Sequence, residues 1–412
     1  MMPDKASVVI AGGGMVGISL ALHLARVLPQ SQSISLVERY PLRDGSDDYH
    51  PSFDARSTAL SYSSRLIYEE LGVWAALARW AEPIRRIHVS SQGRFGSSLM
   101  NADDHGWSGL GYVVENAWLG RVLLEALLST PRIRVISPAS VVDAQPRDGG
   151  MRLSLESTES GEIEADLLVI ADGAQSRLRE RLGLGASSRS YNQHALIANV
   201  AFAASHRSVA YERFTSDGPM ALLPLPATAD APHRSALVWT LPEQRAEALA
   251  VAEPAEFLTA LQGVFGYRLG RAVQVGERFT YPLSLVQARE SVRRHVVVVG
   301  NAAHALHPVA GQGFNLALRD VAALSSVLAG ALARGEYPGD PAVLARYLGR
   351  QRADQQRTIA ASDILPGLFM SADPVFGIAR DLALSGLDLS RSAKSLFVRH
   401  AAGVAAMGTQ HA

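Results

Sequence analysis

A glycine-rich turn near the N-terminus restricts this chain more than any other feature. Five residues that read as a buried strand (SVVIA) are followed at once by GGGMVG, which opens a stretch with helical spacing. Gly12, Gly14 and Gly17 fit the pattern G-x-G-x-x-G. In that pattern the first glycine permits a tight turn, the second lets a pyrophosphate approach the backbone, and the third lets the helix pack against the strand. The alternative is a glycine-rich turn that binds nothing.

A second apolar run, SISLVE (33–38), ends in an acid and completes a βαβ pattern. Its strand is expected to be the parallel neighbour of the first. Glu38 follows Gly17 by 21 residues, where an acid accepts hydrogen bonds from ribose hydroxyls. An acid at this place also argues against a 2′-phosphate on the bound nucleotide. Together these features predict a dinucleotide site at the N-terminus.

An Asp-Gly pair, Asp172 and Gly173, follows another apolar strand, LLVIA. In open α/β sheets, ligands bind beyond the carboxyl ends of the strands, which makes Asp172 a candidate site residue. The alternative is an Asp-Gly turn in which the aspartate caps the helix begun by Ser176. The residues alone leave both interpretations open.

The stretch VVVVGNAAHALHPVAGQGFN (296–315) is a buried strand that runs into a permissive loop and then a helix. Gly311, Gln312 and Gly313 precede a helix that is expected to begin near Phe314, so the first N–H groups of the helix face whatever lies above. A partially negative heteroaromatic group would be stabilised there by the helix dipole. The alternative is a purely structural connection between a strand and a helix.

His304 and His307, in the same loop, have the spacing of a metal pair but no neighbouring carboxylate to complete a ligand set. Packing or polar lining is the better interpretation of both. No serine or threonine lies in a nucleophile-elbow pattern, so hydrolase chemistry has little support.

Composition excludes several classes of protein. The chain has 412 residues, and its 39 basic and 39 acidic side chains cancel, so global charge does not favour nucleic acid or an anionic membrane. It has no cysteine, which excludes disulfides, thiolate metal sites and thiol catalysis. The apolar stretch 8–28 contains three consecutive glycines, His23 and Arg26, and it lacks the flanks of a signal peptide. We expect a soluble protein.

Organisation along the chain predicts an α/β fold with an α+β insertion: a Rossmann-like nucleotide-binding domain, an inserted mixed β-sheet domain and C-terminal helices. Strands and helices alternate at first, whereas residues 189–282 read mainly as short strands with alternating polarity, interrupted by a helix near 253–266. The predicted boundaries are 1–72, 100–180 and 283–335 for the discontinuous cofactor domain, 73–99 and 181–282 for the substrate domain, and 336–412 for the helical region.

Five segments together resemble the flavin-dependent aromatic hydroxylases of the p-hydroxybenzoate hydroxylase type. They are GGGMVG, Glu38, DARSTAL (54–60), ADGAQSRLR (171–179) and GNAAHALHPVAGQGFNLALRD (300–320). Their order and spacing fit over about residues 7–360. Within that family the chain looks most like the 2-polyprenyl-6-methoxyphenol hydroxylases of ubiquinone biosynthesis, through YERFTSDGPMALLPLP, FGYRLG, YPLSL and the 300–315 loop.

The resemblance implies FAD as cofactor. It places the pyrophosphate at Gly12–Gly17, the adenosine ribose on Glu38 and the flavin side of the cofactor near Arg56. It places Arg121 near the phosphates or the ribityl chain, and it ties Asp172 to both FAD and nicotinamide binding. The 300–315 loop would wrap the ribityl chain and the pyrimidine edge of the ring. The cofactor-binding residues that it implies are Gly12, Gly14, Gly17, Glu38, Arg56, Arg121, Asp172, Asn301, Pro308, Gly311, Gly313 and Asn315.

Asn301 departs from the broad family, which has an aspartate at this position. Asparagine keeps an acceptor oxygen and adds donors, so a contact with the ribityl hydroxyls survives without the charge. Losing the charge-assisted part costs about 1 kcal/mol of cofactor affinity. The polyprenyl-methoxyphenol subgroup shares the asparagine, which makes it a mark of that subgroup.

The activity implied is a monooxygenase reaction. NAD(P)H reduces the flavin, O₂ adds to it, and a flavin C4a-hydroperoxide delivers one oxygen to an electron-rich carbon of a polyprenylated methoxyphenol. A base that ionises the phenol would assist, and no residue is assigned to that role, Tyr211 and His304 being unranked candidates. The alternatives are a sister hydroxylase that acts at another ring position or on an unprenylated aromatic, and a non-catalytic flavoprotein-like subunit of a biosynthetic complex.

The expected partners follow from the same resemblance. They are a lipid-tailed phenol, O₂ and other proteins of ubiquinone biosynthesis, with no nucleic acid and no metal. We expect a cytoplasmic protein in peripheral contact with the inner membrane. The apolar tail 363–411 either faces lipid or a partner, or closes the core as packed helices.

Overall fold

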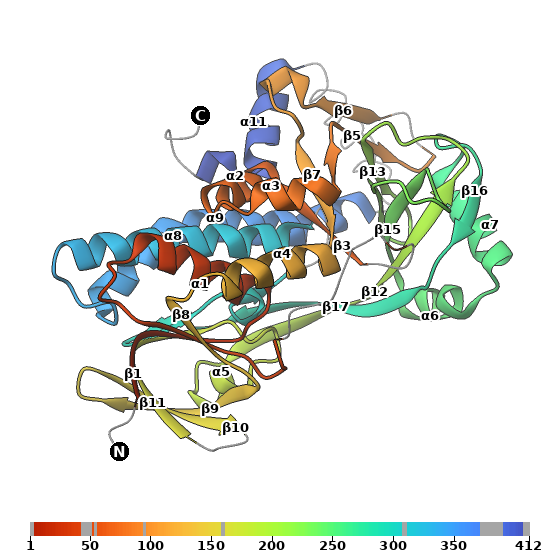
Figure 1. Cartoon of the computed structure of the whole chain (residues 1–412). Coiled ribbons are helices and arrows are strands. Elements are labelled where there is room, and N and C mark those ends of the chain that lie inside the picture. Colours follow the sequence, from red (N-terminus) through yellow and green to blue (C-terminus); the bar gives the residue numbers. More distant parts are fainter. Residues whose placement is uncertain are drawn as a thin grey trace.

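The computed structural model describes residues 4–42, 52, 56–93, 96–157, 161–306, 311–370 and 390–406. Three sheets organise these residues, and Figure 1 shows the two larger ones at opposite ends of the molecule. Strand–helix alternation builds the first sheet, and antiparallel neighbours dominate the second. The predicted α/β fold class with an inserted mixed sheet is confirmed.

The first sheet has eight strands and a parallel centre. Its path is β18 (Val292–Arg293), β19 (Val296–Val298), β11 (Gly161–Ile170), β1 (Asp4–Ala11), β2 (Ile34–Val37) and β8 (Ile133–Ile136), and β10 (Gly150–Ser157) joins β11 to β9 (Ala139–Arg147). Strand β1 is parallel to both β2 and β11, and β11 is parallel to β19. The predicted βαβ unit and the predicted buried strand at the start of the 296–315 stretch are therefore confirmed.

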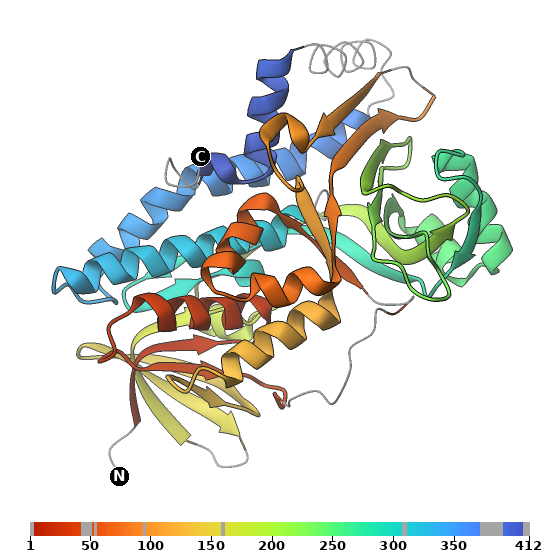
Figure 2. The same cartoon turned by 45° about the horizontal axis from the view of Figure 1, so that its top comes forward.

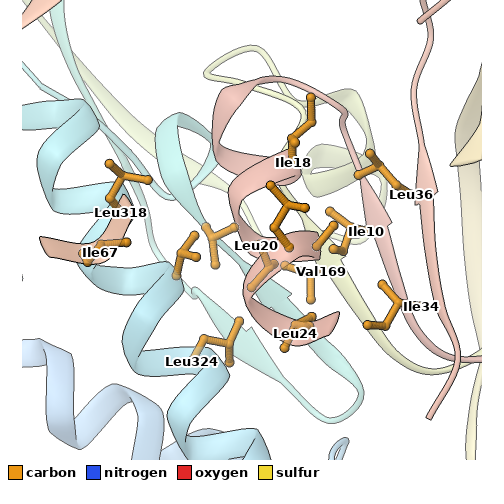
Figure 3. Close-up of a cluster of buried hydrophobic side chains, with 14 of the residues drawn as sticks. Ile10, Ile18, Leu20, Leu24, Ile34, Leu36, Ile67, Val169, Leu318 and Leu324 are labelled. Atoms are coloured by element: carbon orange, nitrogen blue, oxygen red, sulfur yellow. The ribbon is translucent and has the colours of Figure 1, made fainter. Parts of the chain in front are cut away.

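Helices cover one face of this sheet. They are α1 (Met15–Val27), α4 (Asn116–Leu128), α8 (Gln312–Ala333) and α9 (Pro341–Met370), with α2 (Tyr62–Glu70) and α3 (Trp74–Leu77) beside them. Apolar residues of α1 at a spacing of three or four meet side chains of the sheet and of α8, and Figure 3 shows Leu20 and Leu24 between Val169 and Leu324. Each such fully buried leucine contributes about 1.5–3 kcal/mol of transfer free energy. The short helix α5 (Arg177–Arg181) lies near β9, toward the other face.

The second sheet has nine strands. Its path is β20 (His304–Ala305), β17 (Phe279–Ala288), β12 (Ala186–Phe202), β15 (Arg234–Pro242), β14 (Pro219–Pro224), β13 (Val209–Phe214), β5 (Arg86–Ser91) and β6 (Ser97–Asn101), with β16 (Ala272–Val275) on β12. Helices α6 (Glu243–Val251) and α7 (Pro254–Phe265) cover one of its faces, where Phe257 of α7 packs against Trp239 of β15. Helix α7 matches the helix predicted near 253–266, whereas α6 was not predicted.

A three-stranded sheet lies between the two larger ones, and its path is β3 (Ser57–Ser61), β7 (Gly111–Glu115) and β4 (Ala81–Ile84). Val113 and Ile84 of this sheet share an apolar cluster with Ala210 and Ala236 of the nine-stranded sheet. The long strands β12 and β17 also link the two ends of the molecule (Figure 2). Near the C-terminal end, α11 (Arg391–Ala401) packs Val398 against Met100.

Helix α8 is long and apolar enough to cross a membrane by length and composition alone, with a mean hydropathy of 1.6 over 18 residues. Here it is a core helix that packs against α1, α2 and α9. The domain boundaries given above stay a prediction. The sheets divide the chain along similar lines, because the nine-stranded sheet draws on residues 86–101 and 186–305.

Candidate cofactor site

Three parallel strands of the eight-stranded sheet end at the same level. Ala11 of β1 pairs with Ile170 of β11, and Ile170 pairs with Val298 of β19. The segments that follow, at residues 12–17, 171–173 and 299–302, therefore emerge side by side at one edge. This edge brings together three of the segments that the sequence singled out.

The glycines of the first segment are required by close approaches. Gly12 has φ +112°, and a Cβ there would lie 2.5 Å from the Ala171 carbonyl oxygen. A Cβ on Gly17 would lie 1.9 Å from the Gly12 carbonyl oxygen. Gly14, by contrast, faces open space, and it precedes α1 with no side-chain cap on the helix. The first N–H groups of α1 are therefore available to a ligand that lies in the open space beside Gly14.

Glu38 follows β2 and faces this loop. Its Oε2 accepts a 2.6 Å hydrogen bond from the Gly13 N–H, and its Oε1 accepts one of 2.9 Å from the Tyr40 N–H. The carboxylate keeps further lone pairs for hydroxyl donors. Its place beside the glycine loop is the one that a ribose-binding acid requires.

Asp172 lies at the end of β11, next to the glycine loop, since a Cβ on Gly12 would lie 2.8 Å from its amide nitrogen. Burial raises the pKa of its carboxyl group, and a hydrogen bond with Ser176 partly offsets this. The cap of α5 is Ser176 itself, whose Oγ accepts from the Arg179 N–H. The alternative in which Asp172 itself caps the helix is therefore wrong, and its role at the cofactor site stays a prediction.

Asn301 lies in a single 3₁₀ turn, η3 (Gly300–Ala302), directly after β19, and its side chain is exposed. A Cβ on Gly300 would lie 3.1 Å from Cγ1 of Val16, so the turn rests against the first turn of α1. Asn301 is therefore beside the glycine motif and free to face a ligand on the same edge.

Gly311 has φ +62° and precedes α8, where a Cβ would lie 3.2 Å from the Ala59 carbonyl oxygen of β3. Gly313 stands in the first turn, 3.8 Å from Leu306 by the same measure. The helix has neither a side-chain cap nor an acidic residue in this turn. Among the described residues no side chain caps its positive end, which is compatible with the electron-rich group expected there.

Asn315 is buried, and its side chain makes four hydrogen bonds within the protein. Oδ1 accepts from the Ser61 N–H and the Ser64 hydroxyl, both at 2.7 Å. Nδ2 donates to the Ala59 and Gly311 carbonyl oxygens at 2.9 and 2.7 Å. The side chain therefore joins β3 and α2 to α8. It is not available to the cofactor, so a contact between the cofactor and Asn315 would have to use the backbone.

The remaining predicted residues are Arg56, Arg121 and Pro308. Arg56 donates from Nη1 to the Tyr281 hydroxyl at 3.0 Å, which joins the start of β3 to β17 of the other sheet. Arg121 lies on α4 with its Nε 3.5 Å from Oε1 of Glu125, one turn away. Pro308 lies outside the described residues, as does His307.

A buried polar pair that the sequence did not reveal supports the Asn301 turn. His304 Nε2 is 2.8 Å from Oδ2 of Asp320 on α8, and His304 Nδ1 is 3.2 Å from the Gly300 carbonyl oxygen. Burial lowers the pKa of His304 to about 4 and raises the pKa of Asp320 to about 7. The only hint in the sequence was an aspartate inside an apolar helical run.

The arrangement fits a bound FAD. The glycine loop and α1 would hold its pyrophosphate, Glu38 its ribose, Asn301 its ribityl chain, and the start of α8 the electron-rich edge of its ring. The open space at Gly14 and the two uncapped helix starts are the observations that support this fit. The residue assignments themselves stay predictions.

Comparisons with known proteins agree with this arrangement. Residues 5–362 match the family model described as FAD binding domain. The chain is 34% identical to the ubiquinone hydroxylase UbiL of Rhodospirillum rubrum, over 99% of this chain and 92% of the relative. It is 31% identical to the 3-demethoxyubiquinol 3-hydroxylase of Escherichia coli, over 98% and 100%. The crystal structure of p-nitrophenol 4-monooxygenase from Pseudomonas putida has the same fold, with a TM-score of 0.75 at 17% identity over 96% and 97% of the two chains.

Proposed function

Because this chain belongs to the FAD binding domain family, we propose that it hydroxylates a polyprenylated methoxyphenol in ubiquinone biosynthesis. It is an FAD-dependent aromatic hydroxylase with NAD(P)H as electron donor, as the resemblance implied. The alternative of a non-catalytic subunit has no support from these relatives. Bound FAD supplies the transfer of electrons from NAD(P)H and the activation of O₂.

The observation that supports the proposal is that three parallel strands end side by side at the edge of the sheet where the Asn301 turn leads on to α8. Gly12, Asp172 and Asn301 follow β1, β11 and β19 in register. The uncapped start of α8 at Gly311 adjoins β3, whose partner strands contact the nine-stranded sheet. A cofactor that extends from the glycine loop to α8 therefore presents its ring to that sheet, where a substrate would lie.

The lipid-tailed substrate is supported by the relatives and by the apolar lining. Both relatives above are named as hydroxylases of the ubiquinone pathway. One face of the nine-stranded sheet turns toward the cofactor site, and it carries the apolar side chains of Val238, Ala221 and Leu223. An aromatic ring with an isoprenoid tail needs such a surface.

The test is direct hydroxylation by the purified protein. We expect a yellow protein that converts 2-farnesyl-6-methoxyphenol, in detergent, to a product one oxygen atom heavier, in the presence of NADH or NADPH. Under ¹⁸O₂ the added atom should carry the label. A protein that binds no FAD at excess cofactor, or that oxidises NAD(P)H without forming this product, would contradict the proposal.

A second candidate is hydroxylation at another ring position. The E. coli relative is named for position 3 of a demethoxyubiquinol, and it covers the whole of this chain nearly as well as UbiL does. Mass spectrometry of a strain that lacks the gene distinguishes the two candidates. Accumulated polyprenyl-methoxyphenol supports the first, and accumulated demethoxyubiquinol supports the second.

We also propose that the protein is cytoplasmic and contacts the inner membrane peripherally through α11. On this helix Leu396 is 60% and Phe397 42% exposed. Leu99 of β6 is 37% exposed, and its carbonyl oxygen accepts a 2.8 Å hydrogen bond from Nζ of Lys394. The opposite side of α11 packs on the protein through Val398, so both uses considered for the tail are combined in one helix.

Vesicle sedimentation tests this contact. Vesicles of phosphatidylethanolamine and phosphatidylglycerol should carry the protein down, because apolar side chains beside cations favour an anionic interface. The double substitution of Leu396 and Phe397 by serine should abolish this binding, whereas serine at the exposed Val251, on α6, should not. Equal binding by both variants would refute the assignment of α11.

A further inference from the structure

The nine-stranded sheet carries a single carboxylate among the described residues of its strands. That residue is Glu212 in β13 (VAYERF), and neither aspartate nor glutamate occurs in the other eight strands. Burying an unpaired carboxylate in an apolar sheet costs free energy of folding. Such groups are found mainly where they have a partner or a functional role.

Strand register shows which face carries Glu212. Neighbouring residues of a strand point to opposite faces, and Tyr211 points to the helix-covered face, where its ring meets Phe265 edge-on at 5.4 Å. Glu212 therefore points to the other face. It pairs with Ala221, which pairs with Val238.

That other face turns toward the cofactor site. Val238 pairs with Ile197, which pairs with Phe279, and Tyr281 lies two residues along β17 on the same face. The Tyr281 hydroxyl accepts the hydrogen bond from Arg56. One side of this sheet thus carries both the contact with the cofactor domain and Glu212, the carboxylate found in the described strands of the sheet.

A second line of contacts leads to the same conclusion. Ala210 lies two residues before Glu212, on the same face, and it shares a cluster with Val113 of β7. Val113 pairs with Ala59, whose carbonyl oxygen is the one beside Gly311. The start of α8 and the face with Glu212 therefore lie on either side of the same small sheet.

Glu212 has no compensating partner in the part of the chain that the structure describes. No hydrogen bond or ion pair reaches its carboxyl group, and its cross-strand neighbours are Ala221 and Val89. Burial alone raises its pKa to about 8.

Two acids of elements near this face have partners of their own. Glu82 of β4 accepts from the Ser208 hydroxyl, and Asp363 of α9 accepts from the Tyr191 hydroxyl and is paired with Arg189. No charged group contributes to the shift of the Glu212 pKa, and the loss of hydration is its only cause.

On the basis of the hydroxylation proposed above, we propose that Glu212 is the base that accepts the phenolic proton of the substrate. The O–H bond of the phenol breaks, its electron pair stays on the oxygen, and the proton forms a new O–H bond with the carboxylate. The ring becomes more electron-rich at the carbon that takes oxygen. Once that carbon has lost its hydrogen as a proton to solvent, the carboxyl returns its own proton to the phenolic oxygen.

The raised pKa suits this task. A phenol has a pKa of about 10 and an ordinary glutamate one of about 4.3, so the transfer is unfavourable by nearly six orders of magnitude. With the pKa of Glu212 at about 8, the deficit falls to about two orders of magnitude. Neither of the earlier candidates matches this, because Tyr211 points away and Nε2 of His304 lies 2.8 Å from Oδ2 of Asp320 on α8.

The test compares Glu212→Gln with the wild-type holoenzyme on 2-farnesyl-6-methoxyphenol. Glutamine keeps the shape of the side chain but cannot take a proton. We expect the hydroxylation rate to fall by about 10²–10³-fold with unchanged FAD content. The wild-type rate should rise with pH through about 8 as the carboxyl ionises, and the variant should lack that limb. Glu243→Gln, an exposed acid just after β15, is the matched control.

Two further measurements separate catalysis from folding. Phenol probes acidified by ring fluorination need less help from a base, so the ratio of wild-type to Glu212→Gln rates should shrink to under about tenfold with them. Infrared difference spectra of the wild type, without turnover, should contain a protonated carboxyl band that titrates near pH 8 and shifts when the phenol binds. Glu212→Asp should restore part of the rate, even if glutamine disturbs the fold.

The outcomes separate this inference from the function on which it rests. A wild type that forms no hydroxylated product overturns the proposed function and this role with it. A wild type that forms product, with a Glu212→Gln variant of equal rate and equal pH profile, overturns only the role of Glu212. The role also falls if the infrared band is absent or ignores the phenol.

Discussion

At the scale of single residues, the His304–Asp320 pair shows how protonation is built into the site. The Gly300 carbonyl oxygen can only accept, so His304 Nδ1 carries a hydrogen and donates it. A neutral His304 then has a bare Nε2, and only a protonated Asp320 can donate to it across 2.8 Å. Gln355 donates to the other oxygen of Asp320 at 2.9 Å. The contact therefore fits a neutral histidine beside a protonated aspartate, in line with the lowered pKa of His304 and the raised pKa of Asp320.

Substitution of Asp320 tests this assignment. Asparagine can donate to His304 and accept from Gln355, so Asp320→Asn should change the free energy of unfolding near pH 6 by less than about 1 kcal/mol. Alanine should cost about 2–4 kcal/mol, because it leaves both partners buried and unpaired. Denaturant titration measures both. A large loss in Asp320→Asn would mean that the pair is an ion pair instead.

The pH dependence of stability gives a second test of the same group. The pKa of Asp320 in the folded state, about 7, lies above its unfolded value of about 3.9. The folded protein therefore binds the extra proton, and this contribution to stability is complete below about pH 4 and is lost as the pH rises toward 7. Asp320→Asn should flatten this part of the stability profile, and an unchanged slope between pH 4 and 7 would contradict the assignment.

Asn301 makes a prediction about the cofactor itself. An aspartate at this exposed position would regain a charge-assisted hydrogen bond to a hydroxyl, worth about 1 kcal/mol. Asn301→Asp should therefore keep FAD or bind it about fivefold more tightly, measured by fluorescence titration of the apoprotein. Complete loss of binding would show that the residue does not lie on the ribityl chain.

At the scale of elements, different glycines in the turn between β1 and α1 serve folding and cofactor binding. A Cβ on Gly17 meets the Gly12 carbonyl oxygen at 1.9 Å, whereas a Cβ on Gly14 meets nothing within 4 Å. Gly17→Ala should lower the unfolding free energy by about 3 kcal/mol or more. Gly14→Ala should leave the unfolding temperature of the apoprotein nearly unchanged and weaken FAD binding. Calorimetry and FAD titration of both variants decide this, and the reverse pattern would refute it.

Local patterns explain which elements were predictable. The βαβ start, the hairpin of β10 and β11, and helix α8 follow from apolar spacing within a few residues. Strand β12 begins at Ala186, and only its second half, from residue 195, is apolar enough to be recognised from the sequence. Its first half is polar and partly exposed, so no alternation marks it. Helix α6 was missed because EQRAEALAV buries only two residues, Ala246 and Leu249.

The site was predictable to the same extent. The glycine loop and Glu38 carry a spacing that can be counted along the chain, whereas the hydrogen bonds of Asn315 join residues about 250 positions apart. Asp320 and Glu212 likewise gain their character from partners or enclosure supplied by distant strands and helices. A single sequence shows where the acidic residues stand along the chain, but it does not show which distant residues surround them in the fold.

At the scale of the whole molecule, one buried ion pair joins the small sheet to the nine-stranded sheet. Nη2 of Arg234 on β15 is 2.6 Å from Oε1 of Glu115 at the end of β7, and Arg234 is fully buried. Its Nε also donates to the Pro226 carbonyl oxygen at 2.6 Å. The pair fixes the two sheets at the level where the substrate would lie.

Removing one partner should be severe. Arg234→Met leaves the Glu115 charge buried, and we expect a loss of about 3–5 kcal/mol in unfolding free energy. Arg293→Met, which breaks the exposed pair with Glu290, should cost at most about 1 kcal/mol. Chemical denaturation compares the two. Equal losses would mean that the buried pair does not hold the sheets together.

The apolar character of α8 bears on the order in which the chain can fold during synthesis. Its 22 residues need the cover of α1 and α2, and both precede it in the sequence by more than 240 residues. Ribosomes release chains from the N-terminus, so the surfaces that shield α8 exist before it emerges. A circular permutant that begins near residue 311 would expose this helix first, and it should need chaperones or be drawn to the insertion machinery of membranes.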